Sequence, residues 1–325
     1  MDELQRSLLN VFTYSDLDRE VRYRKQNKTM QKYLNLPSAR FIVFLDDRFL
    51  AKVDGSCRHA QLTGDELRPV QCEQSTLVYL GSKSSLRLFA VQISDSKHEH
   101  QLCEGGLEFV GLRESGESMK HEDATLIAYA KAMFHWHKAH RFCGRCGCRT
   151  QSQQGGHARK CTNTDCSATH FPRTDPAIIV AVINEGQCLF GRQKLWPEHR
   201  YSVIAGFVEP AESIEQAVVR EVREETDIRI QTVHYHSSQP WPFPGSIMLG
   251  FTATACGFDI RLNDGELQDA HWRSVSQVVD GIRDGSFRLP PKLSIAYRLI
   301  EDWFDAHSSE RLADILQVLQ PSDNW

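Results

Sequence analysis

Residues 206–228 read GFVEPAESIEQAVVREVREETDI, and the pattern within them decides the fold. Ser213, followed three positions later by Gln216, is typical of a capping box, so the sequence predicts a helix over 213–226. Three apolar side chains fall on one stripe of that helix at helical spacing, and the stripe should face a core. These are Ala217, Val218 and Val222.

Acidic side chains interrupt this apolar stripe. Glu221 and Glu225 lie inside it, while Glu224 borders it and Arg220 is placed to reach Glu224. Two carboxylates one turn apart on a core-facing surface repel each other and lose hydration, unless a cation compensates. Hard oxygen ligands suit Mg²⁺ or Mn²⁺. The alternative is a solvent-exposed helix in which Glu and Arg side chains four residues apart form ion pairs. This alternative fits poorly, because the acids lie on the same face of the helix as the apolar residues.

Strand-like runs surround the acidic helix. Gly206 ends one of them, where a glycine lets the backbone turn closely under a ligand. We expect a mixed sheet with helices packed against it, an α+β sandwich. The expected strands are 177–183, 187–193, 201–205, 228–236, 247–255 and a short one near 270–275, and Pro290 and Pro291 should open a final helix.

Four cysteines are grouped in the middle of the chain. Cys143 and Cys146 form a CxxC pair, and Cys161 and Cys166 form a second pair. Two such thiolate pairs can meet one tetrahedral Zn²⁺, so we expect one structural zinc ribbon per chain. A thioredoxin-like redox pair would leave the second pair unexplained, whereas a ribbon that grips nucleic acid stays open. Cys148, His157 and His170 lie close enough in sequence to exchange as ligands.

The stretch SQPWPFPGS, residues 238–246, alternates prolines with aromatic residues. Because each proline fixes φ and removes an amide donor, we expect a short polyproline-like rod and no strand interior here. The aromatic faces could pack against a neighbouring helix or against a planar ligand.

Composition narrows the function classes. The chain has 325 residues and a net charge of −4, without the basic excess of a dedicated nucleic-acid coat. Its longest apolar run, 177–183, is far too short to span a membrane, and the N-terminus does not resemble a secretory signal. A reducing cytoplasm is the expected location. The expected domains are an α+β domain over 1–120, a linker helix and zinc ribbon over 121–171, a catalytic domain over 172–305 and a helical tail over 306–325.

Residues 206–228, from here on called the box, resemble the signature of a known family. Gly206, Glu212 and the stretch REVREETDI resemble the signature of the Nudix hydrolases, with Asp227 in place of the second glycine. That position should be left-handed, which Asp tolerates at a cost of about 1 kcal/mol. The SQPWPFPGS stretch and the preceding ribbon resemble the NADH pyrophosphatase branch. The implied fold is a Nudix α/β/α sandwich with a mixed sheet.

The resemblance implies hydrolysis of the pyrophosphate bond of NADH or NAD⁺ to NMN(H) and AMP, or removal of NAD caps from RNA. It implies Mg²⁺ or Mn²⁺ held by Glu221, Glu225, Glu266 and the Ala205 carbonyl. Glu224 resembles the residue that orients or deprotonates the attacking water, and Arg220 should hold the glutamates. A catalytically silent nucleotide sensor, or a nucleic-acid-binding ribbon protein, is the competing interpretation.

Substrate contacts are also implied by the resemblance. Relatives sandwich a base between an aromatic pair and form homodimers, and we expect both here, with no membrane partner. The residues expected to contact substrate are Phe171, Phe207, Gln239, Pro240, Trp241, Pro242, Phe243, Pro244, Gly245, Ser246 and Ala296.

Overall fold

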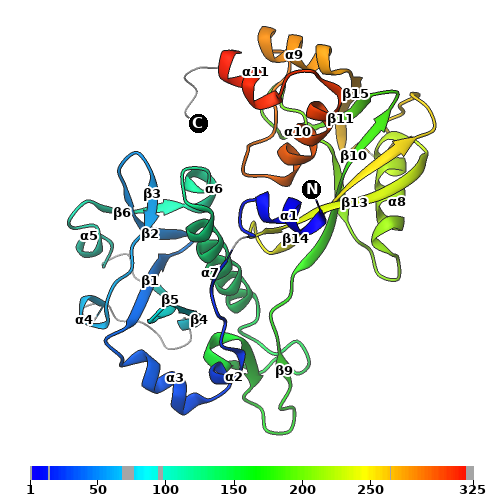
Figure 1. The fold of residues 1–325 in the computed structure, drawn as a ribbon. Helices are drawn as coiled ribbons and strands as arrows, with labels where there is room; N and C mark the ends of the chain where they lie inside the picture. The colour runs from blue at the N-terminus through cyan, green and yellow to red at the C-terminus, as the bar shows by residue number, and fades with distance from the viewer. Residues whose placement is uncertain (1, 14, 68–76, 94–97, 264, 320–325) are drawn as a thin grey trace. The chain divides into compact units, whose positions relative to one another are not determined.

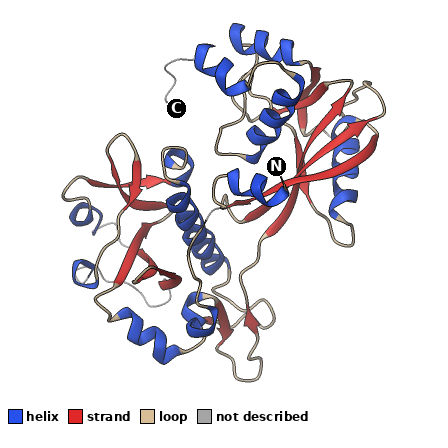
Figure 2. Cartoon of the chain, in the orientation of Figure 1, coloured by secondary structure: helices blue, strands red, loops and turns tan. Residues whose placement is uncertain are grey.

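A computed structural model describes residues 2–13, 15–67, 77–93, 98–263 and 265–319 (Figures 1 and 2). Contacts between residues divide the chain into two units, each of which is described by itself. One unit comprises residues 1–10, 175–239 and 247–325, and the other comprises residues 11–174 and 240–246.

The unit that contains the acidic helix is built on one sheet, in the order β13-β14-β10-β11-β15, with β12 paired to β10. Its elements are α1 (Glu3–Leu9), β10 (Asp175–Asn184), β11 (Gln187–Gln193), β12 (Ile204–Phe207), α8 (Ile214–Thr226), β13 (Ile230–Trp241), β14 (Ser246–Ala255), β15 (Leu267–Arg273), α9 (Val275–Asp284), α10 (Ile295–His307) and α11 (Leu312–Leu319).

Strand β10 shows why its apolar run is continuous. Ile178, Val180 and Val182 pack in one core with the inward stripe of α8. Ile179 and Ala181, which point to the other face, pack in a second core with α9, α10 and α11. Because helices cover both faces of the sheet, neither face of the strand is polar. The predicted α/β/α sandwich is confirmed.

Several element boundaries differ from those predicted. A strand was expected over 201–205, but β12 spans Ile204–Phe207. Before it, Ser202 makes only an isolated bridge to Gly191. The final helix begins at Ile295, after the cap residue Ser294, and not at the prolines. Helix α9 was not predicted, although Ser274 and Gln277 form a capping box that marks its start. None of the helices in the described part of the chain is long and apolar enough to cross a membrane.

The other unit contains a sheet in the order β3-β2-β1-β5-β4, with β6 paired to β2, and a three-stranded ribbon, β7-β8-β9. Strands and helices both occur in its N-terminal part, as expected for an α+β domain, and β1 and β2 form an antiparallel hairpin. The elements are α2 (Val21–Arg24), α3 (Asn27–Leu34), β1 (Ala39–Leu45), β2 (Arg48–Val53), β3 (Cys57–His59), α4 (Gly64–Leu67), β4 (Leu77–Lys83), β5 (Leu86–Ile93), α5 (Glu99–Leu102), β6 (Leu107–Gly111), α6 (Leu112–Ser115), α7 (His121–Ala139), β7 (Thr150–Gln153), a 3₁₀ turn (Gln154–Gly156), β8 (Ala158–Cys161) and β9 (Thr169–His170).

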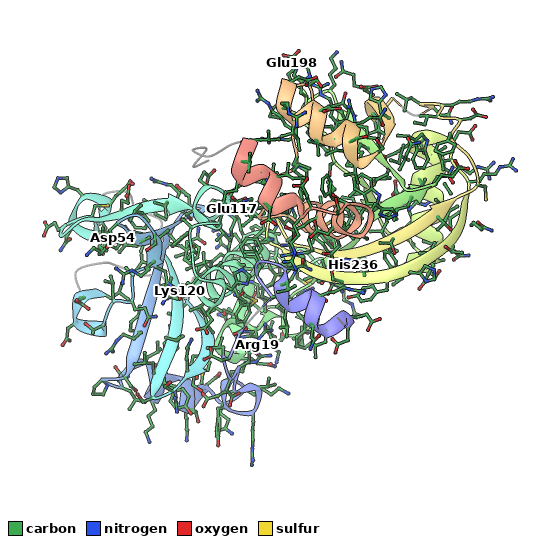
Figure 3. The ribbon with its side chains drawn as sticks, turned by 45° about the horizontal axis from the view of Figure 1, so that its top comes forward. Arg19, Asp54, Glu117, Lys120, Glu198 and His236 are labelled. Carbon is green, nitrogen blue, oxygen red and sulfur yellow. The ribbon has the colours of Figure 1, made fainter. Side chains whose placement is uncertain are left out.

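Helix α7 connects the first sheet to the ribbon along the chain. It follows Lys120, which is labelled in Figure 3, and its buried residues lie all around its circumference. Phe134 packs edge-on against Phe44 of β1, with 5.2 Å between ring centroids. The linker helix expected within residues 121–171 is therefore confirmed as α7, which serves as the core helix of this unit.

The proline stretch is a hairpin turn and not the polyproline-like rod that the sequence suggested. Strand β13 continues through Pro240 to Trp241, residues 242–245 form the turn, and β14 begins at Ser246. The expectation that prolines exclude a strand is wrong at Pro240 because β13 is the edge strand of its sheet, where a missing amide donor breaks no ladder on the open side.

Candidate active site and zinc centre

Helix α8 is capped at both ends by its own sequence. The Ser213 side chain accepts a hydrogen bond from the Gln216 backbone amide, and the Gln216 side chain accepts one from the Ser213 backbone amide. These two bonds complete the predicted capping box. At the other end Asp227 adopts the left-handed conformation, with φ 59°. The caps fix where the helix begins and ends, so the acids between them keep one orientation towards the sheet.

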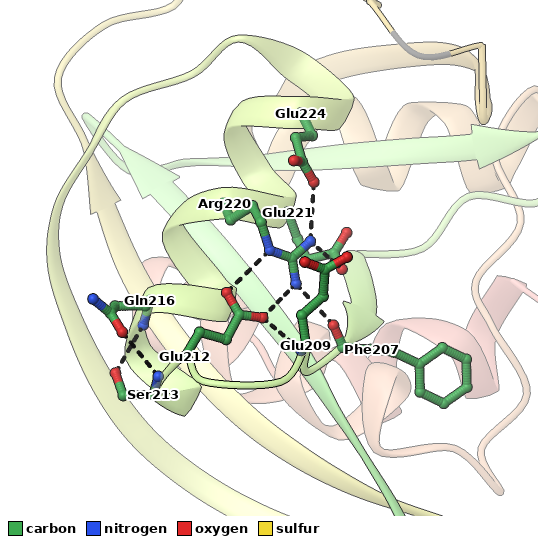
Figure 4. Close-up of polar contacts among 8 residues, drawn as sticks. All are labelled: Phe207, Glu209, Glu212, Ser213, Gln216, Arg220, Glu221 and Glu224. Carbon is green, nitrogen blue, oxygen red and sulfur yellow. Dashed lines mark hydrogen bonds and ion pairs between the residues drawn. The ribbon is translucent and has the colours of Figure 1, made fainter.

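Arg220 is the centre of the site, as Figure 4 shows. Its Nε and Nη2 donate to the two carboxylate oxygens of Glu212, at 3.0 and 2.6 Å. Its Nη1 donates to Glu221 and to Glu224, both at 2.9 Å, and Nη2 also donates to the Phe207 carbonyl at 2.9 Å. These five bonds use all five donors of a guanidinium, so Arg220 fixes the box carboxylates against β12.

Glu212 links the box to the loop that precedes it. Besides binding Arg220, its carboxylate accepts a hydrogen bond from the Glu209 backbone at 2.7 Å. The Arg220 guanidinium, followed by this amide, lowers the pKa of Glu212. The bidentate pair therefore stays ionised over the physiological range and anchors the loop 208–213 to the helix.

Gly206 lies against Glu221. A Cβ atom at Gly206 would stand 2.0 Å from Cδ of Glu221, so any side chain there would displace this carboxylate. The close approach that glycine permits is thus to the carboxylate of the box, whereas the sequence had suggested approach to a ligand. In β12 Gly206 pairs with Ile178, so the central strand fixes its position.

The charged form of Glu221 is disfavoured by its surroundings. Burial raises its pKa and outweighs the opposing effect of Arg220, and the charges of Glu224 and Glu266 raise it further. Glu266 therefore lies close enough to act on Glu221, although its own side chain is exposed. The influence of these acids on one another is the kind that a bound cation relieves.

The other expected ligands lie nearby in the fold. Glu225 is 2% exposed on the inner face of α8, and Ala205 is on β12 next to Gly206. Oxygen donors from a buried carboxylate, two neighbouring carboxylates and a carbonyl form a set that suits a hard divalent cation. The chemistry of these donors suits Mg²⁺ or Mn²⁺, although among the described residues only the four cysteines lie close enough together to form a metal-binding group, so the roles of the glutamates and of Ala205 as ligands stay predictions.

The cysteine cluster has the geometry of a zinc site. The four Sγ atoms of Cys143, Cys146, Cys161 and Cys166 lie within 4.8 Å of one another. The Cys143 and Cys166 sulfurs are 3.8 Å apart, and those of Cys146 and Cys161 are 3.4 Å apart. Zn–S bonds of about 2.3 Å in a tetrahedron separate sulfurs by about 3.8 Å, so the cluster fits one ion.

Neighbouring ligand candidates lie outside this group. Cys148 is not among the clustered residues. His157 is bound to the Tyr129 hydroxyl at 2.5 Å, and His170 places Nε2 3.3 Å from the Cys143 sulfur, where it supports a ligand. The backbone amide of Arg145, together with His170, lowers the pKa of the Cys143 thiol to about 6, which favours the thiolate that a metal requires.

The expected substrate residues have unequal access to solvent. Phe171 and Phe207 are 56% and 61% exposed, which is unusual for such large apolar rings. Gln239 is fully buried, and its amide group binds the Leu293 carbonyl and the Ile295 amide at the start of α10. Ala296 is buried on α10. Gln239 thus holds α10 in place, and the two phenylalanines carry the accessible aromatic surface.

The turn residues 240–246 belong to the unit that contains residues 11–174. Pro242 and Ser246 are buried, Trp241, Phe243 and Gly245 are half-buried, and Pro240 and Pro244 are exposed. Phe243 contacts two residues that the sequence analysis missed, Arg113 and Lys131. No sequence signal could have identified them, because they stand more than a hundred positions earlier and match no motif.

Family models agree with this arrangement. The NUDIX domain matches residues 173–293, the NADH pyrophosphatase-like rudimentary NUDIX domain matches 38–136, and the NADH pyrophosphatase zinc ribbon domain matches 138–171. The zinc ribbon match and the four-cysteine group together support a structural zinc centre. The rudimentary domain gives residues 38–136 a family origin, which the sequence analysis could not supply.

Curated relatives extend the match over most of the chain. The chain is 31% identical to human "NAD-capped RNA hydrolase NUDT12", covering 90% of this chain and 73% of that protein. It is 34% identical to human "NAD(P)H pyrophosphatase NUDT13, mitochondrial", covering 72% and 68%. It is 38% identical to "NAD-capped RNA hydrolase NudC" of Stutzerimonas stutzeri, covering 60% and 67%. With its signature helix, zinc ribbon and rudimentary domain in this order, the chain belongs to the Nudix hydrolase family, in the branch of the NADH pyrophosphatases.

Proposed function

We propose that this protein hydrolyses the pyrophosphate bond of NAD(H), yielding NMN(H) and AMP. The observation that carries the proposal is that Arg220 binds three carboxylates, those of Glu212, Glu221 and Glu224, in a chain whose relatives are named for NAD(P)H and for NAD-capped RNA. A silent sensor on the same scaffold would have no need to hold these acids in place around one arginine. The intact set therefore favours an enzyme.

The chain's own residues supply positioning and proton transfer. Arg220 holds Glu221 and Glu224 in fixed orientations, and the mostly exposed Glu224 is free to meet water on its outer side. Water attacks one phosphorus atom, its proton passes to the Glu224 carboxylate, and the bond to the bridging oxygen breaks. When bound to Glu221, Glu225, Glu266 and the Ala205 carbonyl, Mg²⁺ or Mn²⁺ would neutralise charge on the phosphate oxygens.

Removal of NAD caps from RNA is the second candidate activity, because it cuts the same bond and two of the relatives carry that name. In both reactions the exposed Phe171 and Phe207 would offer stacking surfaces to a base. We further propose a homodimer located in the cytoplasm. Sedimentation of the purified protein and imaging of the tagged chain would test these two points.

Product analysis tests the proposed activity. With Mn²⁺ present, the purified protein should release equimolar AMP and NMNH from NADH, and the rates on NADH, NAD⁺ and NAD-capped RNA would rank the substrates. Glu225→Gln should remove activity while NADH binding stays within about tenfold, because the charge that holds the cation is lost and the base contacts remain. Glu215→Gln, an exposed change on the same helix, is the matched control. Binding of NADH without release of AMP by the wild-type protein would instead support the sensor interpretation.

A further inference from the structure

Basic side chains are concentrated in two segments of the unit that contains residues 11–174. Residues 19–32 and 138–174 together hold thirteen Lys or Arg and two Asp or Glu, whereas the whole chain holds 38 and 42. A positive charge of this density in an otherwise acidic chain favours a polyanionic partner. The basic excess that the composition of the whole chain lacks is therefore present locally.

The cations of residues 19–32 face solvent, and the one acid among them is neutralised. The Glu20 side chain is 8% exposed, accepts a hydrogen bond from the Tyr79 hydroxyl and pairs with Arg87 at 3.7 Å. Six cations remain, of which all but Arg24 are exposed and none forms an ion pair with a described acidic residue. They are Arg19, Arg22, Arg24, Lys25, Lys28 and Lys32. We call residues 19–32 the basic segment.

The basic segment lies against the turn of the zinc ribbon. A Cβ atom at Gly155 of this turn would stand 3.5 Å from Cβ of Arg24. The Arg19 guanidinium carbon lies 4.4 Å from the centroid of the Tyr129 ring, which belongs to α7, the helix that leads into the ribbon. The ribbon and the basic segment are therefore neighbours within one unit, and their charges act together.

An exposed aromatic ring stands among cations at the other end of the ribbon hairpin. Phe142 is 58% exposed, and the Arg149 guanidinium carbon lies 5.9 Å from its ring centroid. The two residues also form an isolated antiparallel bridge, which holds them side by side. Arg141 and Arg145, both exposed, stand close to Phe142 along the chain. Such a ring can stack on a base while the arginines bind the flanking phosphates.

The two ends of the hairpin are a short distance apart. Strands β7 and β8, with four residues each, separate the Phe142 end from the turn that contacts the basic segment. At about 3.4 Å per residue this length is about 14 Å, which a few nucleotides of an extended single strand can span. One strand can therefore contact both ends.

We propose that the basic segment and the Phe142 end of the ribbon form a binding surface for single-stranded nucleic acid, with the cations on phosphates and Phe142 stacked on a base. A single strand fits better than a duplex, because only its bases are free to stack on a side chain. An anionic membrane would satisfy the cations but offers no flat ring to Phe142. The surface lies within one unit and takes part in no hydrolysis, so the proposal goes beyond the proposed function and does not depend on it.

Equilibrium binding tests the cations without any reaction. Fluorescence anisotropy would measure the affinity of the full-length protein for labelled oligouridylate and oligothymidylate of about 12 nucleotides, which contain no pyrophosphate bond. Arg22→Gln, Lys25→Gln and Lys28→Gln combined should weaken binding by roughly tenfold or more at about 0.1 M salt. The slope of log affinity against log salt should become less steep by about 2, because each phosphate contact on a single strand contributes about 0.7.

A second triple variant is the matched control. Lys52→Gln, Arg58→Gln and Lys120→Gln combined remove the same charge from exposed positions of the same unit, away from the basic segment in sequence. An equal loss of affinity in this variant would show that only net charge matters and would overturn the proposal. A wild-type protein that binds neither oligonucleotide would also overturn it, and binding to phosphatidylserine vesicles in that case would identify a membrane surface instead.

Substitution of Phe142 tests the stacking. Phe142→Ala should weaken binding of both oligonucleotides by roughly fivefold or more, as expected for one stacked base, and should leave the salt slope unchanged because the ring carries no charge. Phe142→Trp should keep the affinity because it keeps the stacking surface. Val53→Ala, which shortens another exposed apolar side chain of this unit, is the control.

Zinc content shows whether the ribbon of each variant is intact. Wild-type affinity in Phe142→Ala, or lost affinity in Phe142→Trp with its zinc retained, would contradict the proposal. A wild-type protein that fails to hydrolyse NADH would refute the proposed function alone, and these binding results would still decide the nucleic-acid surface.

Discussion

Arg220 shows how one side chain can organise a catalytic site. Five hydrogen bonds tie it to three carboxylates and one carbonyl, so none of its donors remains for solvent. Glu221 is drawn into this network against the cost of burial, which raises its pKa. At the scale of single residues, the site is therefore a set of acids whose repulsion is only partly balanced by one arginine, and this imbalance favours cation binding.

Gly206→Ala should greatly reduce activity while the fold persists. The added methyl group would stand 2.0 Å from the Glu221 carboxyl carbon and would push this predicted ligand out of place. We expect kcat to fall by roughly tenfold or more, in line with misplacement of a catalytic group by about 1 Å. Gly257→Ala, where nothing lies within 4 Å of the new atom, is the control for both activity and melting temperature. Full activity in Gly206→Ala would contradict the close contact.

At the scale of elements, helices act here through their ends as well as their faces. The capping box of α8 starts the helix directly after Glu212, and the left-handed Asp227 ends it. Helix α7 binds the ribbon through His137, whose Nε2 donates to the Gly156 carbonyl at 2.8 Å while Nδ1 accepts from Arg159 at 2.8 Å. Both arrangements hold functional segments at fixed positions.

Asp227→Gly should stabilise the protein. A non-glycine residue in the left-handed region costs about 1 kcal/mol, which glycine avoids, although glycine also gains freedom in the unfolded chain. We expect the free energy of unfolding to rise by up to about 1 kcal/mol, as measured by the urea midpoint. Asp227→Ala, which keeps a Cβ and lacks the polar group, serves as the comparison and should not stabilise. A glycine variant that is less stable than the wild type would refute the cap argument.

The contact between α7 and the ribbon should be sensitive to acid. Burial, and then the Arg159 charge, lower the pKa of His137 from 6.5 to about 4. Between these values the unfolded chain binds a proton that the folded chain does not, so stability falls as the pH falls through this window. From pH 7 to pH 5 we expect a loss of about 2 kcal/mol in urea unfolding of this unit. In His137→Gln the pH dependence should flatten, and an unchanged slope would exclude His137 as its source.

At the scale of the whole molecule, each unit performs a separate task. One unit builds the layered sandwich that presents the acidic helix, and the other carries the zinc ribbon and holds the turn at 240–246. The closed four-sulfur cluster leaves no open position on the metal, so its contribution is to stability.

Cys161→Ser should lower the zinc content and the melting temperature more strongly than it lowers the rate of hydrolysis. Loss of one sulfur ligand weakens the binding of the zinc ion, which holds the two cysteine pairs of the ribbon together. Zinc per chain, measured by atomic spectrometry, should fall well below one. Cys148→Ser, in the same ribbon but outside the cluster, should keep its zinc. Equal zinc loss in both variants would show that Cys148 is a ligand.

The sequence by itself determined the local features: the capping box, the inward face of α8 with its acids, the two thiolate pairs and the family. These depend on spacing along one segment, because helix periodicity and metal-ligand spacing are short-range. Only the tertiary structure decided that Glu221 lies against Gly206, that Gln239 supports α10 and that Phe243 meets Arg113. These contacts join residues far apart in the chain. Their geometry follows from sheet pairing and core packing, which no short segment encodes.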